Sequence, residues 1–190
     1  NNDLPGILLC SALDRLSRLY GAVPKDPVVV LAGNDLAYQT AFTAQDAGAE
    51  IAAIVDMRSA DQESRAIAEA TSRGIRVISS AAVSEAASSI TGHRLTQITV
   101  KQLDNRGALG DTIETIRCGV LAMSAGFMPA YQLACQAGAS LRYDDDAAEF
   151  EITQLPEGMH LAGSVNSKHS LAAVEADGRN AAGSALRALS

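Results

Sequence analysis

The feature that most constrains the fold is a strand–helix–strand unit between Pro27 and Asp56. Its first segment, PVVVLAGND, contains an unbroken β-branched run, which is typical of a strand buried on both faces of a parallel sheet. LAYQTAFTAQDAGA then follows with helical spacing, and EIAAIVD is a second buried strand. Because crossovers between parallel strands are almost always right-handed, this unit predicts an α/β fold built on a parallel sheet.

The same pattern continues beyond this unit. Residues 60–74 predict a second helix, and RVISS predicts a third strand. Arg94–Leu103 alternate polar and apolar side chains, so we expect a half-exposed antiparallel strand in a small β-meander. Ahead of the unit, residues 7–20 carry a leucine stripe that predicts one amphipathic helix, with Gly21 closing its C-terminus.

The α/β pattern returns after Cys118. CGVLAMSAG predicts a buried strand, PAYQLACQAGA a helix, LRYDDDAAEFEI a hairpin and GMHLAGSV another buried strand, and an Ala-rich helix runs from about 171 to 189. The expected fold is therefore a Rossmann-like parallel sheet with helices on both faces and a small antiparallel β-meander. The α/β segments after Cys118 are a further part of the chain, which the resemblance described below assigns to a partial second dinucleotide-binding domain.

Composition excludes some partners. Hydrophobic residues make up 47% of the 190 residues but aromatic residues only 4%, so Ala, Val, Ile and Leu must build the core. A net charge of −7 argues against a nucleic-acid surface and an electrostatic membrane anchor. The apolar run 28–32 is too short to span a bilayer.

The three cysteines, Cys10, Cys118 and Cys135, lie in apolar runs without CxxC spacing. This pattern favours buried, reduced thiols and hence a cytoplasmic protein. The chain opens on NNDLPG without an initiator Met, which favours an internal fragment of a longer protein.

The turn from Gly33 to Tyr38 occupies the place of a dinucleotide-binding GxGxxG fingerprint. Only the first glycine is present, since Asp35 takes the second position and Tyr38 the third. The Asp35 side chain could cap the helix, but it would compete with a phosphate for the same backbone amides. Gly33, Asn34 and Asp35 are candidate nucleotide contacts, and a retained scaffold with a decayed site is the favoured interpretation.

Asp56 ends the second strand, where a carboxylate of an NAD-type site accepts hydrogen bonds from the adenosine ribose. Arg58 beside it could instead meet a 2′-phosphate. A strand-terminal acid that caps the next loop is the structural alternative. Asp56 is therefore a candidate cofactor contact.

No catalytic residue or metal site is predicted. His93, His160 and His169 lack metal-ligand spacing, and His160 is expected to be packed in a buried strand or at its edge. The acidic cluster Asp144, Asp145 and Asp146 is better explained as a solvated hairpin turn than as a cation site. GxSxG and Walker-type motifs are absent from the sequence.

The order of these segments resembles the α (large) subunit of heterotetrameric sarcosine oxidase. The segments that carry the resemblance are NNDLPGILLCSALDRL, the Asn-Asp-x-Ala-Tyr turn in VVVLAGNDLAYQTAFTAQDAGAEIAAIVDMR, CGVLAMSAGFMPAYQLACQAGASLRYD and GMHLAGSVNSKHSLAAVEADGRNAAGSAL. They span nearly the whole chain in the family's order. The resemblance implies that 1–26 belong to a truncated first FAD/NAD-type domain. It also implies an inserted Rossmann-like NAD(P)-binding domain at 27–117, with 118–190 returning to the first domain.

The resemblance also implies cofactors and partners. In that family the α subunit carries NAD, the β subunit carries FAD, and a covalent FMN lies at their contact. The complete complex, with β, γ and δ subunits, converts sarcosine to glycine. This chain would supply a nucleotide-binding or scaffold portion without catalytic residues, and would be inactive alone.

A second site is suggested by the segment before the last helix. Related disulfide-reductase flavoproteins carry Gly-Asp there, and the acid binds the ribitol of the flavin. Here the pair is Gly163-Ser164, which fits NAD or another adenine nucleotide better than FAD. Gly163, Ser164 and Val165 are therefore candidate nucleotide contacts at a helix N-terminus, with simple strand-to-helix packing as the alternative.

Two alternative functions stay open. The first keeps the architecture and changes the substrate, as in the A subunit of an opine oxidase or a dye-linked proline dehydrogenase. The second is a non-catalytic scaffold that docks neighbouring subunits. We also expect strands at 118–124 and 158–163 to expose apolar edges, which would favour self-association.

Overall fold

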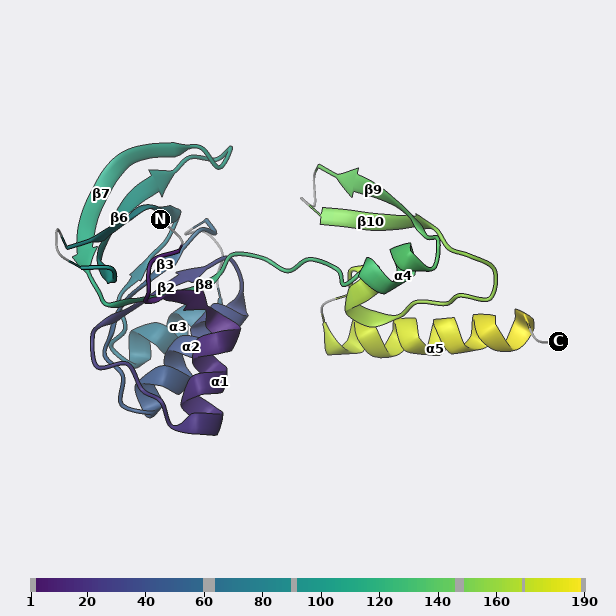
Figure 1. Cartoon of the computed structure of the whole chain (residues 1–190), viewed down its shortest axis with the longest axis horizontal. Helices are drawn as coiled ribbons and strands as arrows, with labels where there is room; N and C mark the ends of the chain where they lie inside the picture. The colour runs from purple at the N-terminus through teal and green to yellow at the C-terminus, as the bar shows by residue number, and fades with distance from the viewer. Residues whose placement is uncertain (1–2, 60–63, 90–91, 146–148, 169, 189–190) are drawn as a thin grey trace. The chain divides into compact units, whose positions relative to one another are not determined.

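The computed structural model describes residues 3–59, 64–89, 92–145, 149–168 and 170–188. The chain divides into two compact units, Asn1–Gly126 and Phe127–Ser190 (Figure 1). The division falls after the strand that follows Cys118 and does not coincide with either boundary, 26/27 or 117/118, expected from the sequence. The assignment of 1–26, 27–117 and 118–190 to two interleaved domains therefore stays a prediction.

The first unit is built on a five-stranded parallel sheet. Its strands, in spatial order, are β1 (Ile7–Leu9), β8 (Val120–Ser124), β2 (Val28–Ala32), β3 (Ile51–Asp56) and β4 (Val77–Ile78). Every residue of β2 is buried, as its β-branched run predicts. The predicted strand–helix–strand unit is confirmed, because β2 and β3 pair in parallel around an intervening helix.

The sheet is the middle of three layers (Figure 1). One face is covered by the helices α1 (Cys10–Tyr20), α2 (Asp35–Asp46) and α3 (Arg65–Ser72). The other face is covered by an antiparallel sheet of β5 (Ala81–Ser88), β6 (Leu95–Leu103) and β7 (Leu109–Arg117). Val30 packs toward the helices, and its neighbours Val29 and Leu31 pack toward the antiparallel sheet, as the two-residue period of a strand requires.

These layers confirm the α/β class and the β-meander but correct one detail. Helices were expected on both faces of the parallel sheet, and among the described residues of the first unit they cover one face only. The meander takes the other face because its alternating strand β6 presents the buried side chains of Leu95, Ile98 and Val100 to the sheet. That apolar side supplies the cover that a second layer of helices would otherwise give.

The N-terminal segment differs from its predicted form. Residues 7–20 were expected to form one helix, but Ile7–Leu9 form β1 and only Cys10–Tyr20 are helical. The three residues of β1 pair in parallel with β8, which is far away in sequence and invisible to a local periodicity argument. Gly21 closes α1 in the left-handed conformation, as predicted, with a φ of 61°.

The prediction of an exposed edge at 118–124 is wrong. Strand β8 lies between β1 and β2 and pairs with both of them. This chain itself supplies both neighbours of β8: β1 directly precedes α1 in the sequence, and β2 follows it. The argument for self-association through this strand therefore fails.

The second unit contains α4 (Gln132–Gln136), the antiparallel pair β9 (Ser140–Asp144) and β10 (Glu149–Gln154), the 3₁₀ turn η1 (Gly163–Asn166) and α5 (Leu171–Ala188). The predicted hairpin and the long helix are confirmed. The strand expected at 158–163 is wrong, because this segment pairs with no strand among the described residues and Met159 and Leu161 are only half-buried. Its apolar letters reflect partial packing rather than a place in a sheet.

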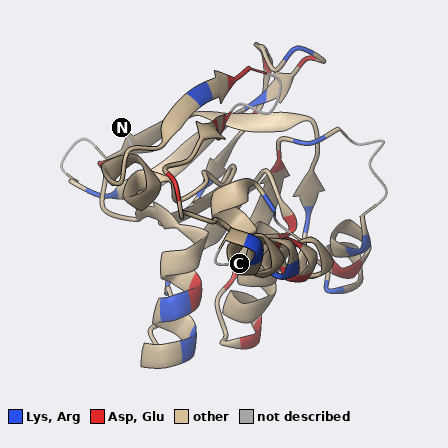
Figure 2. Cartoon of the chain, turned by 90° about the vertical axis from the view of Figure 1, so that its right-hand side faces the viewer, with Lys and Arg blue, Asp and Glu red and all other residues tan. Residues whose placement is uncertain are grey.

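Acidic and basic side chains pair along the helices, as Arg18 does with Asp14 and Arg179 with Glu175. Figure 2 shows acidic and basic residues interspersed over the helices. Among the described residues, no helix combines the length and apolar character needed to cross a membrane.

We predict that Ile54→Ala destabilises the first unit by about 2–5 kcal/mol, because Ile54 is fully buried in the layer under the helices and truncation leaves a cavity. Ile113→Ala is the matched control, since Ile113 lies on β7 with 40% of its surface exposed and should change stability by about 0.5 kcal/mol or less. Urea unfolding followed by circular dichroism measures both. Equal midpoints for the two variants would contradict this packing.

Candidate functional site

The predicted nucleotide turn lies where three parallel strands end. In the sheet register, Ala32 of β2 lies opposite Asp56 of β3 on one side and Ser124 of β8 on the other. The loops that follow these strands therefore converge at Gly33. Open α/β sheets bind ligands at this edge, beyond the carboxyl ends of their strands.

Gly33 is required by close packing against the loop after β8. Its amide donates to the carbonyl oxygen of Ser124 at 2.8 Å. A Cβ atom at this position would lie 2.2 Å from the carbonyl oxygen of Ala125. The retained glycine of the fingerprint is thus explained by contact with the protein itself.

Asn34 caps α2 and joins the same loop. Its Oδ1 accepts the backbone N–H of Leu36 at 3.1 Å and the hydroxyl of Ser124 at 3.0 Å. Its Nδ2 donates to the carbonyl oxygen of Ser124 at 3.1 Å. The cap is therefore Asn34, and the suggestion that Asp35 caps the helix is wrong, since Asp35 is already the first helical residue.

Asp56 is fully buried and surrounded by donors. Its carboxylate accepts the hydroxyl of Tyr38 at 2.5 Å and the backbone N–H of Arg58 at 2.9 Å. The Arg58 guanidinium donates to it through Nη2 at 2.9 Å and through Nε at 3.1 Å. A buried carboxylate needs such partners, because an unpaired charge in the interior is costly.

Arg58 extends this network to the first turn of α2. Its Nη1 forms an ion pair with Asp35 Oδ1 at 2.8 Å, and its guanidinium lies 5.5 Å from the centroid of the Tyr38 ring. Hydrogen bonding to Asp56 raises the pKa of Arg58 above its usual value. Arg58 therefore stays charged, and we call Asp35, Tyr38, Asp56 and Arg58 the carboxylate network.

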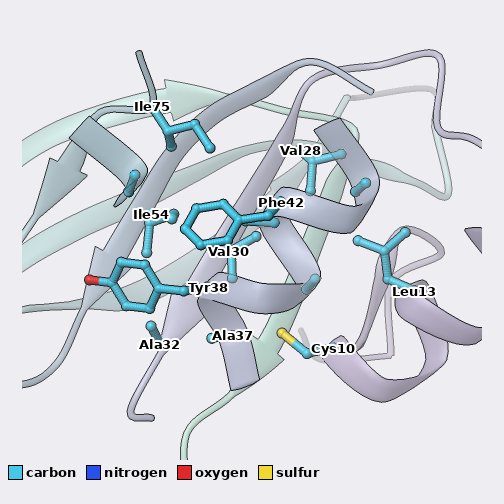
Figure 3. Packing of buried hydrophobic residues seen from close by; sticks show 14 of the residues in the cluster. Cys10, Leu13, Val28, Val30, Ala32, Ala37, Tyr38, Phe42, Ile54 and Ile75 are labelled. Carbon is cyan, nitrogen blue, oxygen red and sulfur yellow. The ribbon is translucent and has the colours of Figure 1, made fainter. Parts of the chain in front are cut away.

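Tyr38 replaces the third glycine of the fingerprint and belongs to both the core and the network. The side chain is fully buried and its ring meets Phe42 edge to face, with centroids 6.4 Å apart. In Figure 3 the ring lies near Ala32 and Ile54, and its oxygen points away from the apolar cluster. Burial first, and then the hydrogen bond to Asp56, raises the pKa of Tyr38, so it remains a protonated donor.

The structure brings together four of the predicted residues, Gly33, Asn34, Asp35 and Asp56. Sequence reasoning missed the role of Tyr38 and the contacts of Arg58 with two carboxylates. One signal could have indicated them: a tyrosine at a fingerprint glycine position can donate to an acid that ends the next strand. Within the carboxylate network, the side chains serve one another as donors and acceptors.

The other candidate residues, Gly163, Ser164 and Val165, belong to the second unit and lie in the turn η1. The amide of Gly163 donates to Asp177 Oδ2 of α5 at 2.9 Å. Asn166 Nδ2 donates to the same carboxylate at 3.2 Å. Asp177 thus holds the turn against α5, and nucleotide binding at these three residues stays a prediction.

The remaining candidates are dispersed. His93 and His160 are exposed, so the expectation of a packed His160 is wrong, and His169 lies outside the described residues. Asp144 ends β9 and Asp145 is exposed, whereas Asp146 lies outside the described part. In the described ranges, no group of three or more His, Cys, Asp and Glu residues could hold a metal ion.

Comparison with known proteins confirms the resemblance predicted from the sequence. The chain is 31% identical over 165 residues to the sarcosine oxidase α subunit of Corynebacterium sp. strain P-1, a match that covers 87% of the chain and 16% of the relative. It is 28% identical over 193 residues to the same subunit of Rhizobium meliloti, a match that covers 99% of the chain and 17% of that relative. The chain thus spans about one sixth of the length of these relatives. No family model matches.

Solved structures share the fold. Thioredoxin reductase of T. acidophilum superposes with a TM-score of 0.66 at 18% identity, and the match covers 95% of this chain and 57% of that chain. Thioredoxin reductase of Lactococcus lactis gives a TM-score of 0.65 at 18% identity over 96% of this chain. These similarities show that the chain has the α/β fold of the thioredoxin reductases.

We predict that Gly33→Ala destabilises the first unit by about 1–3 kcal/mol, because the new methyl group would press on the backbone carbonyl of Ala125. Gly126→Ala is the control, since nothing lies within 4 Å of a Cβ atom at that position. Thermal unfolding of both variants measures the difference. An unchanged melting temperature for Gly33→Ala would show that the turn does not pack as described.

The cysteines give a prediction about pH. Burial raises the pKa of Cys10 to about 12 and that of Cys118 to about 11, whereas Cys135 is only half-buried. Cys10 and Cys118 should therefore remain protonated at pH 8. Because the thiolate is the reactive form, both should react slowly with a maleimide. Mass spectrometry should find Cys135 labelled first in the native chain, and all three labelled in urea. Rapid native labelling of Cys10 would contradict its burial.

Proposed function

We propose that this chain is a nucleotide-fold portion of the α subunit of a sarcosine-oxidase-like amine oxidoreductase, and that its Gly33 turn is structural. The similarity to curated α subunits over most of the chain supports the first part. The carboxylate network supports the second. In the complete enzyme the expected reaction is the oxidative demethylation of sarcosine to glycine, with the flavin chemistry outside this chain.

The carboxylate of Asp56 carries the proposal for a structural turn. In an NAD-type site this acid must accept the hydroxyls of the adenosine ribose. Here it already accepts bonds from Tyr38 and from the cationic side chain of Arg58. Charge-assisted bonds are roughly twice as strong as neutral ones, so a ribose hydroxyl is a poor replacement for the guanidinium.

The charge of Asp35 is a second reason why we do not expect a dinucleotide to bind at this turn. A pyrophosphate would approach the N-terminal amides of α2, where the helix dipole favours a negative charge. The carboxylate of Asp35 already brings a negative charge to this first turn, and Arg58 neutralises it. A pyrophosphate would have to enter beside a carboxylate and break that ion pair.

A nucleotide in the parent subunit would therefore bind elsewhere. We propose the region of Gly163, Ser164 and Val165 as part of such a site, completed by chain segments beyond these residues. NAD is the proposed ligand there, because Ser164 places no carboxylate where an FAD-type site needs one. FAD, FMN and the β, γ and δ subunits would join in the complete enzyme.

A non-catalytic docking scaffold is the second candidate, and the surface of α1 favours it. Leu16, Leu19 and Tyr20 lie near the end of that helix with 42%, 67% and 68% of their surfaces exposed. Exposed large apolar groups on one helix suit a contact with another protein surface. Amine oxidation by the complete enzyme separates this candidate from the first.

We predict that the chain as it stands shows no heat of binding and no thermal shift with NAD at about 1 mM. A site with a Kd of about 1 mM, which corresponds to a binding free energy of roughly −4 kcal/mol, would be half-filled at that concentration. Titration calorimetry and thermal unfolding measure this directly. Saturable binding that Asp56→Asn abolishes would refute the structural role of the turn. Binding abolished by Ser164→Asp would instead support a nucleotide contact in the second unit.

A separate experiment tests the parent enzyme. The full-length α subunit should co-purify with a β-type flavoprotein, and the complex should form hydrogen peroxide from sarcosine. Peroxide formation only with another secondary amine would change the substrate. A complex without any amine oxidation would favour the scaffold.

A further inference from the structure

We infer that Arg58 is an internal occupant of an adenosine-ribose position, and that the residues beneath it retain a site for a dinucleotide with a free ribose 2′-hydroxyl. This inference rests on the proposed function, under which the turn is closed in the natural sequence. It adds the identity of the residues that close the turn and the class of ligand that the opened turn would admit.

The contacts of Arg58 place it across the path of a nucleotide. Nε and Nη2 donate to Asp56, the acid at the ribose position, while Nη1 pairs with Asp35 at the start of α2. One guanidinium thus joins the ribose end of a dinucleotide fold to its pyrophosphate end. Its side chain is 22% exposed, so it forms the outer wall of the network and not part of the deep core.

The framework below Arg58 is intact. Gly33 still makes the tight turn out of β2, and Asn34 still caps α2 in an extended conformation. Asp56 still ends β3 directly opposite Ala32. These are the backbone turn, the helix start and the acid that an NAD-type site uses.

Three side chains account for the closure. Asp35 adds negative charge at the helix start, Tyr38 holds one oxygen of Asp56, and Arg58 holds both oxygens. Shortening Arg58 and removing the other two polar groups would return the Asp56 carboxylate to solvent as an acceptor. Tyr38→Phe keeps the buried ring against Phe42, so the core need not collapse.

The chemistry of Asp56 selects the ligand. A freed carboxylate accepts hydrogen bonds from ribose hydroxyls, as in NAD, and repels a 2′-phosphate, as in NADP. Arg58 is the residue near this acid that could offset that repulsion, and the opened variant lacks it. The opened turn should therefore discriminate in favour of NAD.

The chain offers a matched control on the same helix. Arg73 Nη1 pairs with Asp46 at the other end of α2 at 2.8 Å, and its guanidinium lies 4.6 Å from the ring centroid of Phe42. This arrangement repeats the carboxylate–arginine–aromatic chemistry away from the strand ends. Asp46→Asn with Arg73→Ser removes equivalent charges without opening the turn.

The test compares the natural chain, the triple variant D35N/Y38F/R58S and the control D46N/R73S by titration calorimetry with NAD and NADP. We expect the triple variant to bind NAD at least about tenfold more tightly than the natural chain and about tenfold more tightly than NADP, each factor corresponding to 1.4 kcal/mol. The control should match the natural chain. Adding Asp56→Asn to the triple variant should abolish the gain.

Several outcomes would overturn the inference. A folded triple variant without gained NAD affinity, or a gain that survives Asp56→Asn, would show that no ribose site lies beneath Arg58. Tight NAD binding by the natural chain that Asp56→Asn abolishes would refute the proposed structural turn, and with it the assignment of Arg58 as an internal occupant. If the triple variant fails to fold, the double variant D35N/R58S decides, because it keeps the Tyr38 hydroxyl as a donor to the buried Asp56 while it frees the carboxylate of the contacts that Arg58 makes. No gain in affinity for that variant would equally overturn the inference.

Discussion

The buried carboxylate of Asp56 is the interaction on which the site depends. It lies at the end of β3 with no exposed surface and is held by donors from Tyr38 and Arg58. Removing a partner would leave the carboxylate short of a donor unless water or a ligand reaches it, at a cost of up to about 3–5 kcal/mol for a broken buried pair. The network therefore links strand β3, helix α2 and the loop that follows β3.

Under the proposed function, that arrangement explains how a dinucleotide fold can persist without a nucleotide at the Gly33 turn. In the ordinary site, glycines leave room for a pyrophosphate and the acid waits for a ribose. Here Tyr38 fills the space above Ala32 and supplies a hydroxyl, while Arg58 supplies the positive charge. On this proposal, side chains of the protein make the hydrogen bonds that a nucleotide would otherwise make. The carboxylate at the end of β3 therefore keeps its donors.

Local pattern was enough for the elements whose burial is uniform or strictly periodic. The run VVVLA predicted β2, and the alternation in RLTQITVKQL predicted β6. Pattern failed where a distant partner decides the outcome. Ile7–Leu9 became a strand because β8 pairs with them, and the segment 158–163 did not become one because no described strand pairs with it.

The sequence by itself determined the α/β class, the defective fingerprint at Gly33 and the similarity to sarcosine oxidase α subunits. These follow from residue order, β-branched runs and spacing, which are local properties. Only the tertiary structure decided that Arg58 bridges Asp35 and Asp56, that Asn34 is the cap, and that β8 is an inner strand. The physical reason is that a carboxylate at a strand end can face a ribose, water or an arginine with the same letters around it. Which partner it meets depends on side chains that the fold brings together.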